Sequence, residues 1–236
     1  MTTSIDAILV PQGAEYRSVC KGLSRASVAT PPVFAIPAGG VPLTQYLERW
    51  QQAGHFSNLA QPNVLLMGLC GSLLPQYSVG DVVLYESCWE WKSDRKGGDY
   101  RQCDRELTAS VHSVLQKRVT LVKALTSDIL IYSAPQKCDL GKLYGAEVVD
   151  MEGLAALEVL TRAGVAVAML RVVSDDCRHD LPNLSAAFHS DGSFKPLPLG
   201  MGLLRQPLAA TRLVSGAMRG LRVLQHATTS LFSTRR

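Results

Sequence analysis

Short apolar runs alternate with amphipathic stretches along almost the whole chain. The runs at 5–10, 33–36, 64–69, 80–85, 119–125, 129–132 and 165–173 are typical of buried strands, since they are rich in Val, Ile and Leu. Helices are expected from about residue 14 and over 41–50, 138–144 and 153–160, and a polar loop over 92–105. This alternation predicts a single α/β domain spanning residues 1–236.

Two acidic sites lie at the ends of one predicted helix–strand unit. Glu152 precedes the helix at 153–160, which Gly164 terminates, and the strand at 165–173 leads to Ser174 and Asp175. Helices leave the carboxyl edge of a parallel sheet and strands return to it. Glu152 and Asp175 are therefore expected on one edge, where open α/β folds bind ligands.

Two further segments are expected at the same edge. Glu15 follows the first strand, and the glycine-flanked residues 68–71 follow the strand at 64–69. Converging acids beside such backbone suit cleavage of an N-glycosidic bond through an oxocarbenium-like sugar. One carboxylate can hold the ribose hydroxyls, an acid can protonate the departing base, and a second carboxylate can activate water.

The segments VVDMEG (148–153) and LRVVSDD (170–176) resemble the nucleoside phosphorylase/nucleosidase superfamily. The segment VLLMGLCGSLLPQYSVGDVV (64–83) is similar to that family's glycine-containing phosphate and ribose segment with its GD strand. The resemblance extends from Ile5 to about Pro182. It implies a three-layer α/β/α sandwich with a mixed central sheet, a nucleoside as the small-molecule partner, and assembly into a homo-oligomer.

The resemblance also implies roles for individual residues. Asp175 would act as the acid at purine N7, oriented by Ser174, and Glu152 would hold the ribose 2′- and 3′-hydroxyls with Met151 packed on the sugar. Glu15 falls where the methylthioadenosine/S-adenosylhomocysteine nucleosidases place the residue that activates water. Three further residues would border the base: Cys70, Gly71 and Ile131.

Two departures from the family bear on the substrate and the attacking group. The nucleosidases have an aromatic residue where this chain has Leu130, so base stacking must be weaker or come from elsewhere. Hexameric phosphorylases grip phosphate with an Arg and a Ser where Leu66 and Leu69 stand here. The leucine side chains have no charge and no hydrogen-bond donor with which to bind a phosphate dianion, so hydrolysis is favoured over phosphorolysis. Arg17 could supply a cation for phosphate instead.

A narrower resemblance concerns the substrate. The segments DILIYSAPQKCDLGKLYGAEVVDMEG and DDCRHDLPNLS are most similar to the hopanoid-associated phosphorylases, a group linked to removing adenine from adenosylhopane. The favoured function is thus cleavage of an adenine nucleoside, adenosylhopane or another 5′-substituted adenosine. The alternatives are a phosphate-dependent purine nucleoside phosphorylase and a non-catalytic nucleoside-binding or membrane-peripheral protein.

The composition and the spacing of cysteines and histidines bear on the cellular location of the protein and on its need for a metal or cofactor. Six cysteines without a CxxC pair, together with no signal peptide and no run long enough to span a bilayer, predict a cytoplasmic protein with reduced thiols. Neither His179 nor His189 has metal-ligand spacing, so no metal and no cofactor are expected. Arg171 interrupts an apolar strand and is expected to be a buried partner of an acid, with direct substrate contact as the alternative.

The C-terminal part of the chain is basic, although the net charge is only +4. No Asp or Glu follows Gly192, and a basic amphipathic helix is expected at about 203–232. Arginines on one face (205, 212, 219 and 222) oppose an apolar face (213, 214, 217, 218, 221 and 224). The helix is either an ordinary one packed on the sheet or a surface attracted to anionic lipid. Nucleic-acid binding is not expected, because the stripe lacks aromatic residues.

Overall fold

The computed structural model describes residues 4–54, 61–93, 98–183 and 204–233. Eight strands form its sheet: β1 (Ala7–Pro11), β2 (Val33–Ile36), β3 (Asn63–Ser72), β4 (Val82–Trp91), β5 (Tyr100–Gln102), β6 (Thr120–Ser127), β7 (Val148–Asp150) and β8 (Ala166–Asp175). The helices are α1 (Ala14–Leu23), α2 (Gly40–Gln52), α3 (Arg105–Leu115), α4 (Ala134–Tyr144), α5 (Gly153–Arg162) and α7 (Pro207–Leu231), with a 3-10 turn at Gln116–Arg118.

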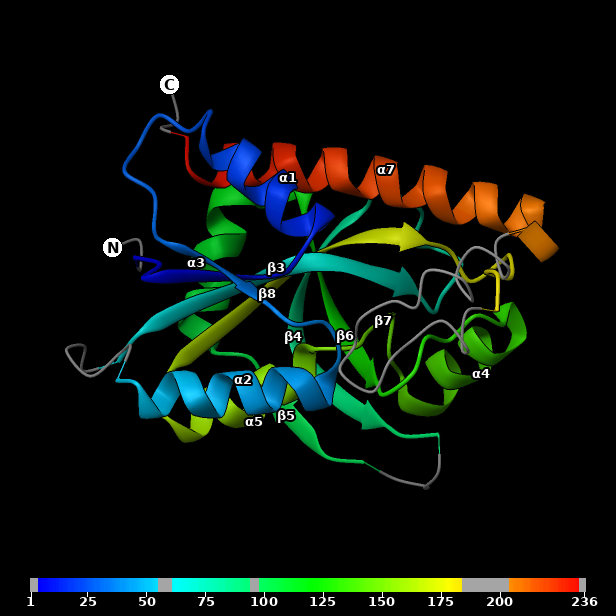
Figure 1. Cartoon of the computed structure of the whole chain (residues 1–236), viewed down its shortest axis with the longest axis horizontal. Coiled ribbons are helices and arrows are strands. Elements are labelled where there is room, and N and C mark those ends of the chain that lie inside the picture. Colours follow the sequence, from blue (N-terminus) through cyan, green and yellow to red (C-terminus); the bar gives the residue numbers. More distant parts are fainter. Residues whose placement is uncertain (1–3, 55–60, 94–97, 184–203, 234–236) are drawn as a thin grey trace.

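The sheet is mixed and lies between helices. Its order is β2-β1-β3-β7-β6-β4-β5, and β8 pairs with β3 in parallel and with β4 in antiparallel orientation. Helices α1 and α7 cover one face, and α2 and α5 cover the other (Figure 1). The expected α/β/α sandwich with a mixed central sheet is confirmed.

Strand pairing brings three strand ends together. Because β7 pairs with both β3 and β6, the strands β3, β8, β4, β6 and β7 form a closed circuit of pairings. At one point of this circuit Gly71 pairs with Val149 of β7 and with Asp175 of β8, just after a register shift between Cys70 and Gly71. The ends of β3 and β8 therefore meet β7 at Gly71, and β7 runs antiparallel to both.

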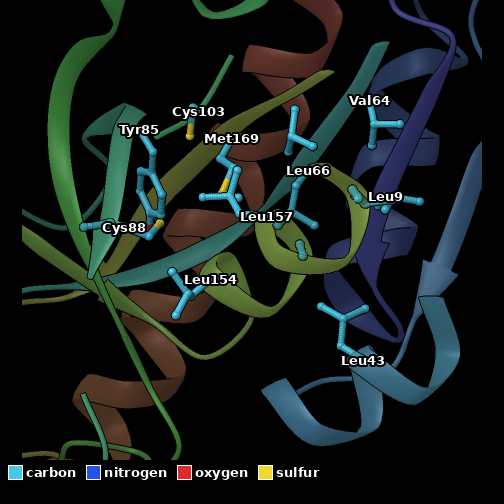
Figure 2. Close-up of a cluster of buried hydrophobic side chains, with 14 of the residues drawn as sticks. Leu9, Leu43, Val64, Leu66, Tyr85, Cys88, Cys103, Leu154, Leu157 and Met169 are labelled. Carbon is cyan, nitrogen blue, oxygen red and sulfur yellow. The ribbon is translucent and has the colours of Figure 1, made fainter. Parts of the chain in front are cut away.

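Each face of the sheet has its own apolar core. The core beneath α2 and α5 includes Leu9, Leu43, Leu66, Leu157 and Met169 (Figure 2). Leu66 is fully buried there. Complete burial of one such side chain contributes about 1.5–3 kcal/mol. The opposite core, beneath α1, α3 and α7, is built from a second set that includes residues 8, 19, 65, 107, 170 and 224.

Some predicted elements differ from the structure. The strand expected at 129–132 is wrong: these residues form a non-regular connection between β6 and α4, where the Ser127 hydroxyl donates to the carbonyl of Ile129 (2.6 Å). Helix α4 therefore begins at Ala134, earlier than expected, with Ser133 as its N-cap. Helix α3 was not predicted; Asp104 caps it by accepting from the Leu107 N–H (2.8 Å).

The structure also describes the C-terminal helix and the cysteines. The helix expected at about 203–232 is α7, which runs from Pro207 to Leu231. Within the described ranges, no helix is long and apolar enough to cross a membrane. All six cysteines are unpaired.

Candidate active site

A buried arginine anchors the site. Arg171 of β8 is fully buried, and its Nη2 donates to Asp150 Oδ2 at 2.9 Å and lies 3.5 Å from Glu152 Oε2. Burial alone disfavours the charged guanidinium, but Asp150 and Glu152 outweigh this effect and raise the pKa of Arg171. The expectation of a buried arginine paired with an acid agrees with this geometry.

Asp150 is held from three sides. Besides Arg171, it accepts from the hydroxyl of Thr126 (2.8 Å) and from the N–H of Gly153 (3.1 Å) at the start of α5. The Thr126 hydroxyl in turn accepts from the N–H of Leu154 (2.9 Å). This network ties β6, β7, β8 and α5 together beneath the site, and it fixes the direction of the Arg171 side chain.

Glu152 sits at the N-cap of α5, where β7 ends. Its Oε1 accepts from the N–H of Gly39, immediately before α2, at 2.9 Å. Burial raises the pKa of Glu152, while the charge of Arg171 opposes that rise. The carboxyl group is therefore fixed between Gly39 and Arg171.

Glu15 lies in the first turn of α1 and reaches across to β3. Its Oε1 accepts from the N–H of Leu69 at 2.6 Å. Burial of the carboxyl group and the nearby Glu152 raise the pKa of Glu15 to about 7, against the opposing charge of Arg171. A carboxyl group that titrates near neutral pH is suited to general-base chemistry.

Asp175 is the last residue of β8, and its two oxygens have different partners. The Ser174 hydroxyl lies 3.0 Å from Oδ1 and 3.2 Å from the carbonyl oxygen of Cys70. The ammonium group of Lys137, from α4, donates to Oδ2. The side chain is 14% exposed, so its carboxylate is accessible only in part.

Two glycines of β3 make room for these side chains. A Cβ atom on Gly68 would lie 2.1 Å from Nη1 of Arg171 and 2.8 Å from Oε1 of Glu15. A Cβ atom on Gly71 would lie 2.7 Å from Oδ2 of Asp175. The glycine-containing segment singled out in the sequence therefore provides the space in which the charged groups approach β3.

A cavity of about 540 Å³ opens beside this cluster. Met151, Leu130 and Gly39 line it, together with residues of α2, α5 and the ends of β4 and β6. Ile131, expected at the base, is instead buried in a small core with Leu73, Leu125 and Leu140.

The other residues singled out in the sequence lie in the core or at the surface. Cys70 is 4% exposed and packs in the core, and burial raises the pKa of its thiol, so it stays protonated. Leu66 is also in the core, and Arg17 is exposed on α1. His179 pairs with Asp176 at 3.0 Å. The described residues contain no cluster that could hold a metal, and His189 lies outside them.

Sequence reasoning gave no role to Lys137, Asp150 or Thr126. Asp150 carried a signal, because an acid in an apolar strand needs a cation just as Arg171 needs an acid. Lys137 carried none, because its burial depends on how α4 packs against the segment after β8. Its neighbours in sequence are equally compatible with an exposed position.

Comparison with known proteins places this geometry in a family. A family model described as the phosphorylase superfamily matches residues 55–191, whereas no curated protein sequence matches the chain. Among solved structures, futalosine hydrolase of Helicobacter pylori is similar, with a TM-score of 0.65, 14% identity and 95% of each chain covered.

Two other similar structures are nucleosidases. A mutant of the H. pylori 5′-methylthioadenosine/S-adenosylhomocysteine nucleosidase with 5′-methylthioadenosine in its active site has a TM-score of 0.65 and 16% identity, covering 95% of this chain and 98% of that one. The Campylobacter jejuni nucleosidase has a TM-score of 0.62 and 15% identity, covering 94% and 99%. These likenesses show a shared fold. The family match spans more than half of the sequence and includes Glu152 and Asp175, and the chain therefore belongs to the phosphorylase superfamily.

Proposed function

We propose that the protein is an enzyme that hydrolyses the N-glycosidic bond of a purine nucleoside, with adenine as the favoured base. Asp175 protonates the leaving base, Glu152 binds the ribose hydroxyls, and Glu15 activates the attacking water. Superfamily membership and the nucleosidase folds of the similar structures support N-glycosidic cleavage.

The observation that carries the choice of water is the charge around Arg171. Three carboxyl groups, those of Glu15, Asp150 and Glu152, contribute to the electrostatics of this one guanidinium. Its cation is already paired with Asp150, and Leu66 and Leu69 add no cation or side-chain donor. A phosphate dianion would be repelled here, whereas water is neutral.

The geometry at Gly68 further supports an oriented water. Nη1 of Arg171 has no hydrogen-bond partner among the described residues, and both it and Glu15 Oε1 lie within 3 Å of the position that a Cβ atom on Gly68 would take. Water can accept from a guanidinium N–H and donate to a carboxylate at the same time. Ionised Glu15 would take a proton from that water as it attacks C1′.

The lining of the cavity favours a substrate with an apolar 5′-substituent. Its lining includes Val41, Pro42, Ile129, Leu130 and Trp91, and this surface is predominantly apolar. Met151, the proposed sugar contact, is part of the same lining. Methylthioadenosine and adenosylhopane are the two test substrates that match this chemistry.

Base release from a nucleoside panel tests the proposal. Purified protein is incubated with adenosine, methylthioadenosine, adenosylhopane and inosine, with and without phosphate, in H₂¹⁸O. We expect phosphate-independent release of adenine and one ¹⁸O atom in the sugar product. A strict phosphate requirement with a sugar 1-phosphate product would establish the phosphorylase alternative, with exposed Arg17 as the candidate cation.

The non-catalytic alternative predicts a different outcome. Tight nucleoside binding without base release, unchanged by Asp175→Asn, would establish a binding protein. A large rate loss in that variant, with nucleoside binding retained, would exclude it.

We also propose that the protein forms a homo-oligomer in the cytoplasm and contacts membranes peripherally through α7. Val214 and Met218, which were expected on the apolar face opposite the arginines, are instead 52% and 50% exposed, and Leu208 is 76% exposed. The arginines at 212, 219 and 222 are exposed on the same helix. Exposed cationic and apolar groups on one helix suit an anionic lipid surface.

A further inference from the structure

The strongest feature outside the assigned roles is the buried lysine of α4. The Lys137 side chain is 1% exposed, and its ammonium group contacts Asp175 Oδ2 and donates to the carbonyl oxygen of Asp176 at 3.1 Å. A buried ammonium is costly unless it is paired, and a buried ion pair is a weak device for stability alone. The position of Lys137 on the proposed acid therefore points to the reaction.

The ion pair poses a chemical problem for Asp175 as an acid. In an ion pair between a lysine and a carboxylate the proton is on the ammonium nitrogen, because an amine is a much stronger base than a carboxylate. A carboxylate has no proton to give to a purine. The nearest proton for Asp175 is then the one on the Lys137 ammonium.

We propose that Lys137 is a positioning residue that supplies, through Asp175, the proton that leaves with the base. This inference rests on the proposed function. The proton passes from Nζ to the Asp175 carboxylate and on to N7 of the purine. As the C1′–N9 bond breaks, its electron pair goes to the base. The lysine is left as a neutral amine, and water reprotonates it after product release.

The groups around the pair have other partners. Asp176 accepts from the N–H groups of Arg178 and His179 and pairs with the His179 ring. Cys138 on α4 contacts the carbonyl oxygen of Cys177 (3.6 Å). Burial raises the pKa values of Cys177 and of Cys70, so these thiols stay neutral. Of these groups, the Lys137–Asp175 pair is therefore the one that holds a proton available for transfer to the purine.

The pH dependence of kcat/KM, measured for Lys137→Met and Lys137→Arg, tests the inference. In the methionine variant Asp175 must hold its own proton, so the alkaline limb is expected to move at least two pH units lower and the pH optimum to fall. At pH 7.5 the loss of activity should be about 100-fold. The arginine variant keeps the cation but withholds the proton, so its activity should be low at every pH.

A purely structural role predicts the opposite pattern, namely rescue by arginine and an unshifted profile for methionine. Either result would overturn the inference while leaving the proposed function intact. Lys137→Gln is a second neutral variant if methionine prevents folding, and Lys142→Met, at an exposed position of the same helix, is the matched control. If the parent protein releases no base from the panel, the proposed function fails and the inference falls with it.

Discussion

The Glu15 carboxyl group lies among buried groups beside Glu152, and burial raises its pKa to about 7. As the proposed base it must be ionised, so kcat should rise with pH through about 7 on the acid limb. Glu15→Gln keeps an acceptor for the Leu69 N–H but cannot take a proton. We expect a 10²–10⁴-fold lower kcat and no acid limb in a pH–rate profile.

The same residue predicts a gain in stability. A folded pKa above the ordinary 4.5 means that the folded state binds the proton more tightly, so stability declines as pH rises from about 4.5 to 7 and stays lowered above 7. Glu15→Gln avoids this penalty and should be more stable by up to about 3 kcal/mol at pH 8. Urea unfolding at pH 8 and pH 4 measures it; an equal gain at both values would contradict the assignment.

Gly68 provides the third prediction at this scale. A Cβ atom there would lie 2.1 Å from Nη1 of Arg171, whose guanidinium is fixed by Asp150. Gly68→Ala must therefore displace a buried ion pair, at a cost of about 3 kcal/mol, and activity should fall with it. Gly40→Ala is the control in urea unfolding, because its Cβ would meet only ordinary contacts at 3.7 Å.

At the scale of elements, α7 packs onto the strand end that carries Asp175. A Cβ atom on Gly216 would lie 2.2 Å from the carbonyl oxygen of Ser174. Alanine normally stabilises a helix by about 1 kcal/mol relative to glycine, but here it must push α7 away from β8.

Gly216→Ala should therefore lower both stability, by about 2 kcal/mol, and kcat. Thermal unfolding and the base-release assay measure the two effects. Ser215→Ala, at an exposed position one residue earlier in α7, should change neither. A Gly216→Ala protein as active as the parent would show that α7 does not position Asp175.

The outer face of α7 gives a separate prediction. Arg212→Glu combined with Arg219→Glu removes two exposed cations beside the apolar side chains of Leu208 and Met218. Co-sedimentation with anionic vesicles should weaken at least tenfold, and less so at high salt. The control is Lys117→Glu combined with Lys142→Glu, which reverses the charge of two exposed lysines outside α7 and gives the same net charge as the test variant. Equal binding by both double variants would remove the membrane interpretation.

At the scale of the whole molecule, the local sequence pattern predicted those features that depend on neighbouring residues in the chain. Apolar runs located most strands. The expected parallel pairing holds between β3 and β8 and between β6 and β7, but β7 runs antiparallel to β3 and therefore to β8. Strand direction alone therefore does not place Glu152 and Asp175 at one edge; the shortness of β7 and its pairing beside Gly71 keep the end of β7 near the end of β8. Membership of the phosphorylase superfamily was confirmed, and the motifs that indicated it are contiguous segments of the sequence.

Features that depend on closure of the sheet were missed. Strand β7 has only three residues, and its pairing with both β3 and β6 brings Asp150 to Arg171. Ile131 was expected at the base because of the family resemblance, but the non-regular chain after β6 directs its side chain into the core. Lys137 became a site residue only through tertiary packing. Such long-range contacts leave no periodic trace in the sequence.

The proposed oligomer predicts where a second copy docks. Val41 is 68% exposed at the start of α2, and Ile129, which is 42% exposed, lines the same cavity. Burying these side chains against a partner would also cover the cavity and exclude water from an apolar substituent. Val41→Asp should therefore yield monomers in sedimentation equilibrium and raise KM for methylthioadenosine more than for adenosine.

Leu143→Asp is the matched control for that experiment, since Leu143 is 75% exposed on α4 and is not among the residues that line the cavity. It introduces the same charge at an equally exposed apolar position, so it should leave both the oligomer and KM unchanged. Dissociation by Leu143→Asp alone would move the interface to α4. In that case the cavity would be open to solvent in the assembly, and its apolar lining would have to select substrates unaided.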